Sequence, residues 1–255
     1  MTDAPVADRR EDVARIDEAL DAARVVLERF RAGREDVTWK GRDDPVTAAD
    51  LAVDRAIRRV LPRAGEGWLS EETEDDPARL DASRVWVVDP IDGTKEFVRA
   101  VPEWCVSIGL VEDRHAVAGG ILNPATGERV VGSIETGVTL NGRPVTASTR
   151  SDLDGAVVLA SRSESARGEW DRFRDAGFTI RPTGSVAYKL ARVAAGLADA
   201  TWTLTPKHEW DVAAGAALVV AAGGAVWQPG AGPWRFNAAR PRLPGLAASG
   251  AGLAD

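Results

Sequence analysis

Two aspartates lie three positions apart in the segment Trp86-Val-Val-Asp-Pro-Ile-Asp-Gly-Thr94. The apolar run before them predicts a buried strand, so the chain carries Asp89 and Asp92 out of the core where that strand ends. Pro90 stiffens the turn, and both carboxylates can therefore converge on one point. Two hard oxygen ligands suit a divalent cation such as Mg2+, and the backbone carbonyl of Ile91 is available as a further ligand.

The residues that follow these aspartates favour phosphate binding. Gly93 and Thr94 lead into a helix-compatible run at 95–99, whose first N–H groups would point at whatever the metal holds. Free amides at a helix N-terminus, together with the charge of a metal ion, form a cradle for phosphate. The alternative is that Asp89, Asp92 and Thr94 merely cap a turn, as Asp-Gly pairs commonly do.

Further acids could complete a metal site. Glu71 is the first of two glutamates that follow a short apolar run. Asp211 opens an apolar helix at 212–222, and Asp50 lies three residues into a helix that Thr47 can cap. Each acid has a structural alternative, because the glutamates begin an acidic surface run and both aspartates are good helix-capping residues.

Other phosphatase mechanisms fit the sequence poorly. The central aspartates do not have the Asp-x-Asp spacing of a nucleophile pair, and the chain has no Gly-x4-Gly-Lys-Ser/Thr loop. Cys105, the only cysteine, has Val111 where a Cys-x5-Arg loop needs arginine, so we expect a buried structural thiol. The two histidines, His115 and His208, are expected at the surface. Attack by metal-activated water is the remaining mechanism.

The composition narrows the choice of partners. The chain of 255 residues has a formal net charge of −7 at pH 7, whereas proteins that bind nucleic-acid backbones concentrate Lys and Arg. A small anionic substrate held by metal ions remains compatible. No run approaches the roughly 18 apolar residues of a membrane span, and the polar N-terminal stretch does not resemble a signal peptide. We therefore expect a cytoplasmic protein whose partner is neither a nucleic-acid polymer nor a membrane.

Hydrophobic periodicity predicts an N-terminal α+β part, residues 1–147. Apolar residues spaced by three and four favour a helix over 7–31, and a second helix opens at Thr47. Short β-rich runs then predict a largely antiparallel sheet over 81–147, supported by the hairpin signal Asn141-Gly142. The strands before that hairpin are expected at 85–88, 106–111, 116–122 and 129–134.

The remaining residues, 148–255, predict a C-terminal α/β part. Strand and helix patterns alternate there, which is typical of layered α/β folds. A Gly and Pro cluster at 229–233 predicts a turn, and a cleft between the two parts is the expected ligand site. Strands are expected at 157–160, 178–181, 198–204 and 225–228, with helices near 167–175, 185–196 and 211–222.

Five motifs in register make the chain similar to the inositol monophosphatase superfamily, which includes inositol monophosphatases, 3'(2'),5'-bisphosphate nucleotidases and histidinol phosphatases. The motifs are Lys40 with Asp44-Pro-Val-Thr-Ala-Ala-Asp50, Ser70-Glu-Glu72, Trp86 to Thr94, Gly184-Ser185, and Glu209-Trp-Asp-Val-Ala-Ala-Gly215. The resemblance implies an α/β (α+β) fold, a layered α/β/α/β/α sandwich. Ser70 departs from the glycine that is usual in inositol monophosphatases, and we expect only a local backbone adjustment there.

The same resemblance implies a site with two or three Mg2+ ions. Glu71, Asp89 and the Ile91 carbonyl would hold the ion that activates water, and Asp89, Asp92 and Asp211 would hold a second. It also implies inhibition by lithium and, because members are often dimeric, a possible homodimer.

The catalytic roles also follow from the resemblance. Asp50 would complete a third, looser metal site and help to orient the nucleophile. Thr94, hydrogen-bonded toward Asp50, would share water activation with Glu71. The amides of Gly93 and Thr94 would bind the phosphate.

A few residues point to a substrate. Thr94-Lys-Glu-Phe97 resembles the Thr-Lys-Glu-Phe of bacterial bisphosphate nucleotidases, and Lys189 and Lys207 could face a second phosphate or simply be solvated. We therefore expect a 3'(2'),5'-bisphosphate nucleotidase that converts 3'-phosphoadenosine 5'-phosphate to AMP. The residues expected to contact phosphate or substrate are Gly93, Thr94, Gly184, Ser185, Lys189, Lys207 and Glu209.

Three alternatives remain open. The run Val193-Ala-Ala-Gly196 suits inositol-1-monophosphatases equally, and Val101-Pro-Glu-Trp104 resembles the histidinol phosphatase-like branch. A regulator that binds metal and phosphate without catalysis belongs to a different class. It would require loss of a water-activating group, yet Glu71 and Thr94 are both present.

Overall fold

Seven strands form the larger sheet of the protein. A computed structural model describes residues 9–41, 44–203, 205–229 and 234–254, with the backbone alone at 39–41 and 44–45. The strands follow chain order across the sheet, and every neighbouring pair is antiparallel except the first, β3 with β4. They are β3 (Gly67–Ser70), β4 (Arg84–Asp92), β5 (Cys105–Glu112), β6 (His115–Asn123), β7 (Glu128–Ser133), β8 (Gly137–Leu140) and β9 (Arg143–Val145).

The predicted antiparallel sheet and its hairpin are confirmed. Asn141 and Gly142, which join β8 to β9, have φ angles of 49° and 76°. Both values lie in the left-handed region that a tight two-residue hairpin turn requires.

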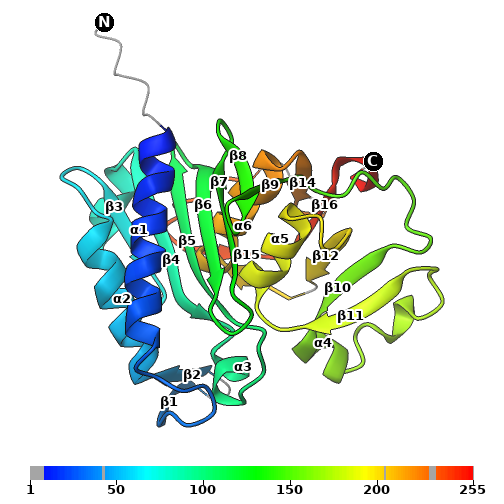
Figure 1. Cartoon of the computed structure of the whole chain (residues 1–255), viewed down its shortest axis with the longest axis horizontal. Coiled ribbons are helices and arrows are strands. Elements are labelled where there is room, and N and C mark those ends of the chain that lie inside the picture. Colours follow the sequence, from blue (N-terminus) through cyan, green and yellow to red (C-terminus); the bar gives the residue numbers. More distant parts are fainter. Residues whose placement is uncertain (1–8, 42–43, 204, 230–233, 255) are drawn as a thin grey trace, which may run out of the picture.

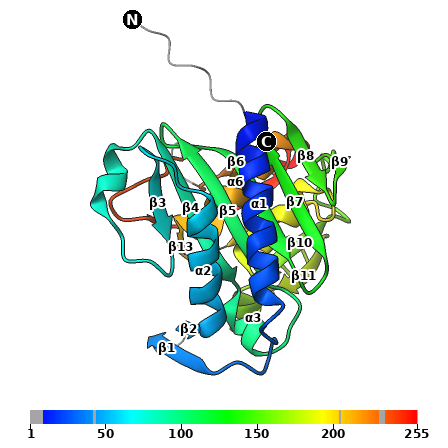
Figure 2. The same ribbon diagram turned by 60° about the vertical axis from the view of Figure 1, so that its left-hand side comes forward.

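Helices cover both faces of this sheet. On one face, α1 (Arg9–Leu27) and α2 (Ala48–Val60) lie side by side (Figures 1 and 2). On the other, α5 (Val186–Ala194) and α6 (Glu209–Ala221) separate it from a second sheet. Helix α6 approaches so closely that a Cβ on Gly119 of β6 would lie 2.5 Å from the Ala214 carbonyl oxygen. Among the described residues, no helix is both long and apolar enough to cross a bilayer.

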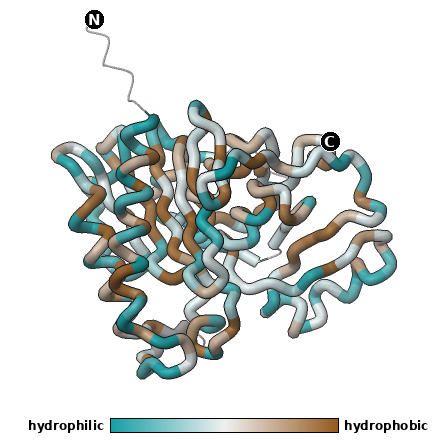
Figure 3. The backbone as a smooth tube through the Cα atoms, in the orientation of Figure 1, coloured by the Kyte–Doolittle hydropathy of each residue, from teal (hydrophilic) through white to brown (hydrophobic). Residues whose placement is uncertain are grey.

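The second sheet has five strands in the order β11-β10-β12-β16-β14. A short helix, α4 (Arg162–Ala166), and an aromatic cluster that includes Trp170 and Trp202 cover its outer face. The chain thus has the expected layered α/β sandwich, with apolar stretches along the strands (Figure 3). The strands are β10 (Val157–Ser161), β11 (Thr179–Thr183), β12 (Ala200–Thr203), β14 (Gly224–Trp227) and β16 (Leu246–Gly250).

One predicted helix was wrong, and several strands were not predicted. The helix expected near 167–175 is replaced by α4 and a 3-10 helix at Asp171–Phe173, because Gly168, with φ of 76°, ends α4. The sequence did not indicate β16, nor the short pairs β1 (Val37–Gly41) with β2 (Asp44–Thr47) and β13 (Lys207–His208) with β15 (Arg242–Leu243).

Some predictions fall outside the described residues. They are the first two residues of the helix at 7–31, the side chains of Lys40 and Asp44, residue 204 and most of the turn at 229–233. The division at residue 147 stays a prediction, because α6 of the second part packs on the sheet of the first.

A buried ion cluster ties α1 to the larger sheet. Glu66 accepts hydrogen bonds from Arg15 of α1, from Arg84 and from the Trp86 indole of β4, and its side chain is only 8% exposed. Burial alone would raise the pKa of Glu66, but the hydrogen bonds from Arg15 and Trp86 lower it to about 2. The charged form is therefore the stable one in the folded protein.

Glu66→Gln should destabilise the protein by about 2 to 4 kcal/mol, because it leaves the buried Arg15 without a counter-charge. The stabilisation by Glu66 is fully present above its unfolded pKa of about 4.5 and disappears as the pH falls toward 2. The difference in unfolding free energy between the wild type and the variant, measured by urea unfolding, should therefore be constant from pH 6 to 8 and shrink below about pH 4.5. As a control, Glu28→Gln removes a carboxylate that pairs with Arg24 and is 61% exposed. This variant should lose under about 1 kcal/mol of unfolding free energy. Equal costs for the two variants would contradict the role of the cluster.

Candidate active site

A cavity of about 620 Å3 opens between the end of β4 and the first turns of α5 and α6. Its walls come from segments far apart in the sequence, which the layered fold brings together. The predicted residues that line it are Glu71, Asp89, Ile91, Asp92, Gly93, Thr94, Gly184, Ser185, Lys189, Lys207 and Asp211.

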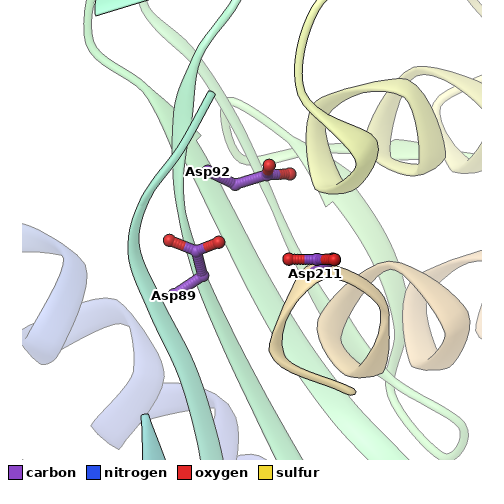
Figure 4. Close-up of side chains that lie close together, drawn as sticks. All are labelled: Asp89, Asp92 and Asp211. Atoms are coloured by element: carbon purple, nitrogen blue, oxygen red, sulfur yellow. The ribbon is translucent and has the colours of Figure 1, made fainter. Parts of the chain in front are cut away.

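Three aspartates converge at the bottom of this site. Asp89 and Asp92 extend from the end of β4, Asp211 from the first turn of α6, and one oxygen of each lies within 4.8 Å of the others (Figure 4). Asp89 pairs with Ser107 and Asp92 with Cys105, so β4 has one residue more than β5 over this interval. In a regular strand, residues three apart face opposite sides, and the bulge turns both carboxylates to the same side.

Asp92 is held by the loop before α5. Its Oδ2 accepts hydrogen bonds from the Ser185 hydroxyl at 2.7 Å and from the Ala187 amide at 2.5 Å. Ser185 has φ of 56°, a left-handed value that is uncommon outside glycine, so these contacts offset a strained backbone. One oxygen of Asp92 is thereby fixed while the other is left to the cluster.

Asp211 and Asp50 are both helix-capping residues, and in each the cap uses one of the two carboxylate oxygens. Asp211 Oδ2 accepts the His208 amide at 2.8 Å as a helix cap, which occupies only one of its two oxygens. Asp50 Oδ2 accepts from the Thr47 amide and hydroxyl in a capping box, while its Oδ1 accepts the Thr94 hydroxyl at 3.3 Å. The second oxygen of Asp50 accepts from Thr94, although Asp50 itself does not line the cavity. The second oxygen of Asp211 takes no part in the helix cap, so capping is compatible with a role in the aspartate cluster.

The packing of acids has a strong electrostatic effect. Burial, and then the charges of Glu71 and Asp92, raise the pKa of Asp89 well above its ordinary value. Burial and the charge of Asp92 raise the pKa of Asp211 to about 7. Burial lowers the pKa of Lys189 to about 8, although Asp92 opposes that shift. Converging, mutually repelling hard oxygen donors are the set that a divalent cation such as Mg2+ favours, so these residues fit the expected metal.

Glu71 and Thr94 occupy the edge of the cluster. Glu71 lines the cavity beyond the end of β3 and acts on Asp89 through its charge, but it does not belong to the group within 4.8 Å. The Thr94 hydroxyl lies 3.0 Å from the Ile91 carbonyl oxygen. Ser70 is accommodated by a hydrogen bond from its hydroxyl to Asp54 at 2.5 Å.

Glu209 does not line the cavity, so its predicted substrate contact has no support from the geometry and stays a prediction. Its buried carboxylate accepts the backbone amides of Asn237 and Ala238 at 2.7 and 3.0 Å. Residues two apart on a helix point in nearly opposite directions. Asp211 faces the site, so Glu209 turns away from it.

Sequence analysis missed two arginines of the cavity wall. Arg162 begins α4 and Arg242 lies on β15, and both line the cavity together with Lys95 of the short helix α3 (Thr94–Val98). No local motif marks either arginine, because the fold alone brings them to the site. His208 also lines the cavity and stacks on Trp210, with ring centroids 4.5 Å apart.

The predictions for the two histidines and for the cysteine are confirmed. His115 is exposed and contacts Arg235, and His208 is exposed as well. Cys105 is buried, and its sulfur lies 3.3 Å from the Ser185 hydroxyl oxygen. Burial raises the pKa of this thiol well above its ordinary value, which agrees with a structural role.

Comparison with known proteins identifies similar chains. The sequence profile of the inositol monophosphatase family matches residues 9–251. Inositol monophosphatase 2 of Solanum lycopersicum is 32% identical over 94% of this chain and 95% of its own. Nus factor SuhB of Xylella fastidiosa is 35% identical over 74% and 71%, respectively. The crystal structure of CysQ from Bacteroides thetaiotaomicron, a bacterial member of the inositol monophosphatase family, superposes with a TM-score of 0.77 at 27% identity and covers 94% of this chain and 97% of that one.

Asp89→Asn should weaken Mg2+ binding by about tenfold or more, because it removes a ligand charge at the centre of the cluster. Isothermal titration calorimetry with MgCl2 measures this directly. As a control, Asp175→Asn changes an exposed aspartate outside the cavity and should bind Mg2+ like the wild type. Equal affinities of the two variants would contradict the assignment of Asp89 as a ligand.

Proposed function

Since the chain belongs to the inositol monophosphatase family of phosphatases, we propose that it is a Mg2+-dependent phosphomonoesterase acting on 3'(2'),5'-bisphosphate nucleotides. In this proposal 3'-phosphoadenosine 5'-phosphate is converted to AMP. The observation that carries it is the set of cations around the carboxylate cluster. Five basic residues line the cavity: Lys95, Arg162, Lys189, Lys207 and Arg242.

These cations exceed what one phosphate needs. A single phosphate can be bound by the metal and by the amides of Gly93 and Thr94, whereas a second phosphate needs side chains further along the wall. The stacked rings of His208 and Trp210 provide a flat aromatic surface in the same cavity, and aromatic rings commonly stack on nucleobases. Both features suit a nucleotide better than inositol.

The proposed metal ligands are Glu71, Asp89, the Ile91 carbonyl, Asp92 and Asp211, for two or three ions. When bound, magnesium supplies positive charge that acidifies water and neutralises the phosphate oxygens. Glu71 accepts the proton of the attacking water. The Thr94 hydroxyl, oriented by Asp50 and the Ile91 carbonyl, helps to place that water for an in-line attack on phosphorus. The bond from phosphorus to the ribose oxygen breaks on the opposite side, and that oxygen leaves as a hydroxyl after it takes a proton from water.

Residues of α5, of the turn before it and of β13 serve the substrate side. The Lys189 ammonium group donates to the Ser185 carbonyl at 2.8 Å and is held beside Asp92, facing the reacting phosphate. Lys207, fixed by the Thr205 hydroxyl at 3.0 Å, extends the positive wall toward the second phosphate. Gly184 and Ser185 form the turn before α5, the helix that carries Lys189.

Two other functions have specific support. The name of the tomato relative, an inositol monophosphatase, favours an inositol monophosphate as substrate. The name of the Xylella relative, a Nus factor, favours a regulatory binding role. Histidinol phosphatase rests only on the resemblance of residues 101–104.

Steady-state rates on four substrates separate these functions. We expect kcat/KM at least about tenfold higher for 3'-phosphoadenosine 5'-phosphate than for inositol 1-phosphate, histidinol phosphate or fructose 1,6-bisphosphate. Asp211→Asn should lower kcat by about two orders of magnitude or more, because it removes a ligand charge. A preference for inositol 1-phosphate would overturn the proposed substrate. Binding of all four without turnover would favour the regulatory role instead.

A further inference from the structure

The segment before β5 lies between the two glycine turns of the site. A Cβ on Gly93 would lie 3.0 Å from the Glu103 carbonyl oxygen, and one on Gly184 would lie 2.7 Å from the same atom. The phosphate-binding turn and the α5 loop therefore pack against one backbone carbonyl. The backbone of residue 103 therefore sets the spacing between the Gly93 turn and the Gly184 turn.

The Glu103 side chain makes a second connection. Its Oε2 accepts the Gly184 amide at 2.7 Å and the Arg162 Nε at 3.0 Å, and the Arg162 Nη2 also donates to it. Charge-assisted hydrogen bonds of this kind are roughly twice as strong as neutral ones. One carboxylate thus holds the α5 loop and an arginine of the cavity wall.

These contacts are next to the one that holds Asp92. Ser185 follows Gly184, and its hydroxyl holds Asp92 in place. Ser185 has a left-handed φ, and a non-glycine residue keeps this conformation only where surrounding contacts hold it. Asp92 accepts a hydrogen bond from the Ser185 hydroxyl, and Glu103 accepts one from the Gly184 amide.

Arg162 depends on the same carboxylate for its orientation. It lines the cavity while Glu103 binds its Nε and Nη2, and the Pro182 carbonyl accepts from Nη2 at 3.3 Å. A guanidinium group fixed along one edge presents its remaining edge in a defined direction. Arg162 is thereby oriented for an anionic group of the substrate.

We propose that Glu103 is a positioning residue, which fixes the Gly184–Ser185 turn for Asp92 and orients Arg162 toward the second phosphate of the substrate. The part that concerns Arg162 rests on the proposed function. The part that concerns Asp92 rests on the metal site alone. Loss of Glu103 should therefore weaken both metal binding and substrate binding.

A merely structural ion pair offers a matched control. Glu128 pairs with Arg192 at 2.9 Å, and the side chains of Glu128 and Glu103 are both 23% exposed. Glu128 does not line the active-site cavity. Truncating either glutamate removes one partly exposed pair, so a general loss of stability would affect both variants alike.

The test measures Mg2+ affinity by calorimetry without substrate, and KM for 3'-phosphoadenosine 5'-phosphate at saturating Mg2+. Glu103→Ala should weaken Mg2+ binding about tenfold and raise KM about tenfold, as loss of outer-sphere partners commonly does. Glu103→Gln retains an acceptor for the Gly184 amide, so its Mg2+ affinity should stay within about threefold of the wild type. Arg162→Met should raise KM about tenfold and leave Mg2+ affinity within about threefold. Glu128→Ala should change neither quantity by more than about twofold.

The outcomes separate this inference from the proposed function. Wild-type Mg2+ affinity in Glu103→Ala would overturn the positioning role, and so would an equal loss in Glu128→Ala. An unchanged KM in Arg162→Met would overturn the role of Arg162. If the wild type hydrolyses inositol 1-phosphate only, the substrate proposal fails, and a weakened Mg2+ affinity in Glu103→Ala still supports the link from Glu103 to Asp92.

Discussion

Repulsion among three converging aspartates, two of them buried and Asp211 half-buried, is the constraint on which the rest of the structure depends. The oxygens lie within 4.8 Å of one another, and two unit charges at that distance or less repel by about 3 kcal/mol or more in a medium of effective dielectric constant near 20. Part of this cost is offset by the donors that Ser185 and Ala187 present to Asp92. Burial raises the pKa values of Asp92 and Asp211, and the charges of Lys189 and Lys207 oppose that rise. The remaining repulsion favours a site that binds cations.

The architecture makes that convergence possible. Glycines 109 and 119 on β5 and β6 let α6 lie directly on the sheet, since a Cβ at either position would meet the backbone of Ala214 at 2.8 and 2.5 Å. This close approach brings the first turn of α6, with Asp211, to the end of β4. The β-bulge then turns Asp89 and Asp92 to the same side. A helix set further from the sheet would leave Asp211 out of reach.

Much of this arrangement was predictable from local patterns. The strand before Asp89, the capping box of Thr47 and Asp50, and the Asn141-Gly142 hairpin each depend on a few neighbouring residues, and each was found where expected. The predicted metal and catalytic roles remain proposals, although the fold brings Glu71, Thr94 and Asp211 to one cavity.

The features that depend on distant packing were not predictable. Arg162 and Arg242 join the cavity only through the second sheet and its connections, so no motif marked them. The orientation of Glu209 depends on the rotation of α6 about its axis, which the seating of that helix on the larger sheet determines. Strand β16 consists largely of small residues and lacks the alternation of a half-buried strand, although all five of its residues are buried.

The central claim is that Asp89, Asp92 and Asp211 form a divalent-cation site. Anomalous diffraction from crystals soaked in MnCl2 tests it most directly, because Mn2+ replaces Mg2+ at oxygen-ligand sites and is visible by its own scattering. We predict an anomalous peak at about 2.0 to 2.3 Å from a carboxylate oxygen of each of the three aspartates. A well-diffracting soaked crystal with no peak among these carboxylates would contradict the claim.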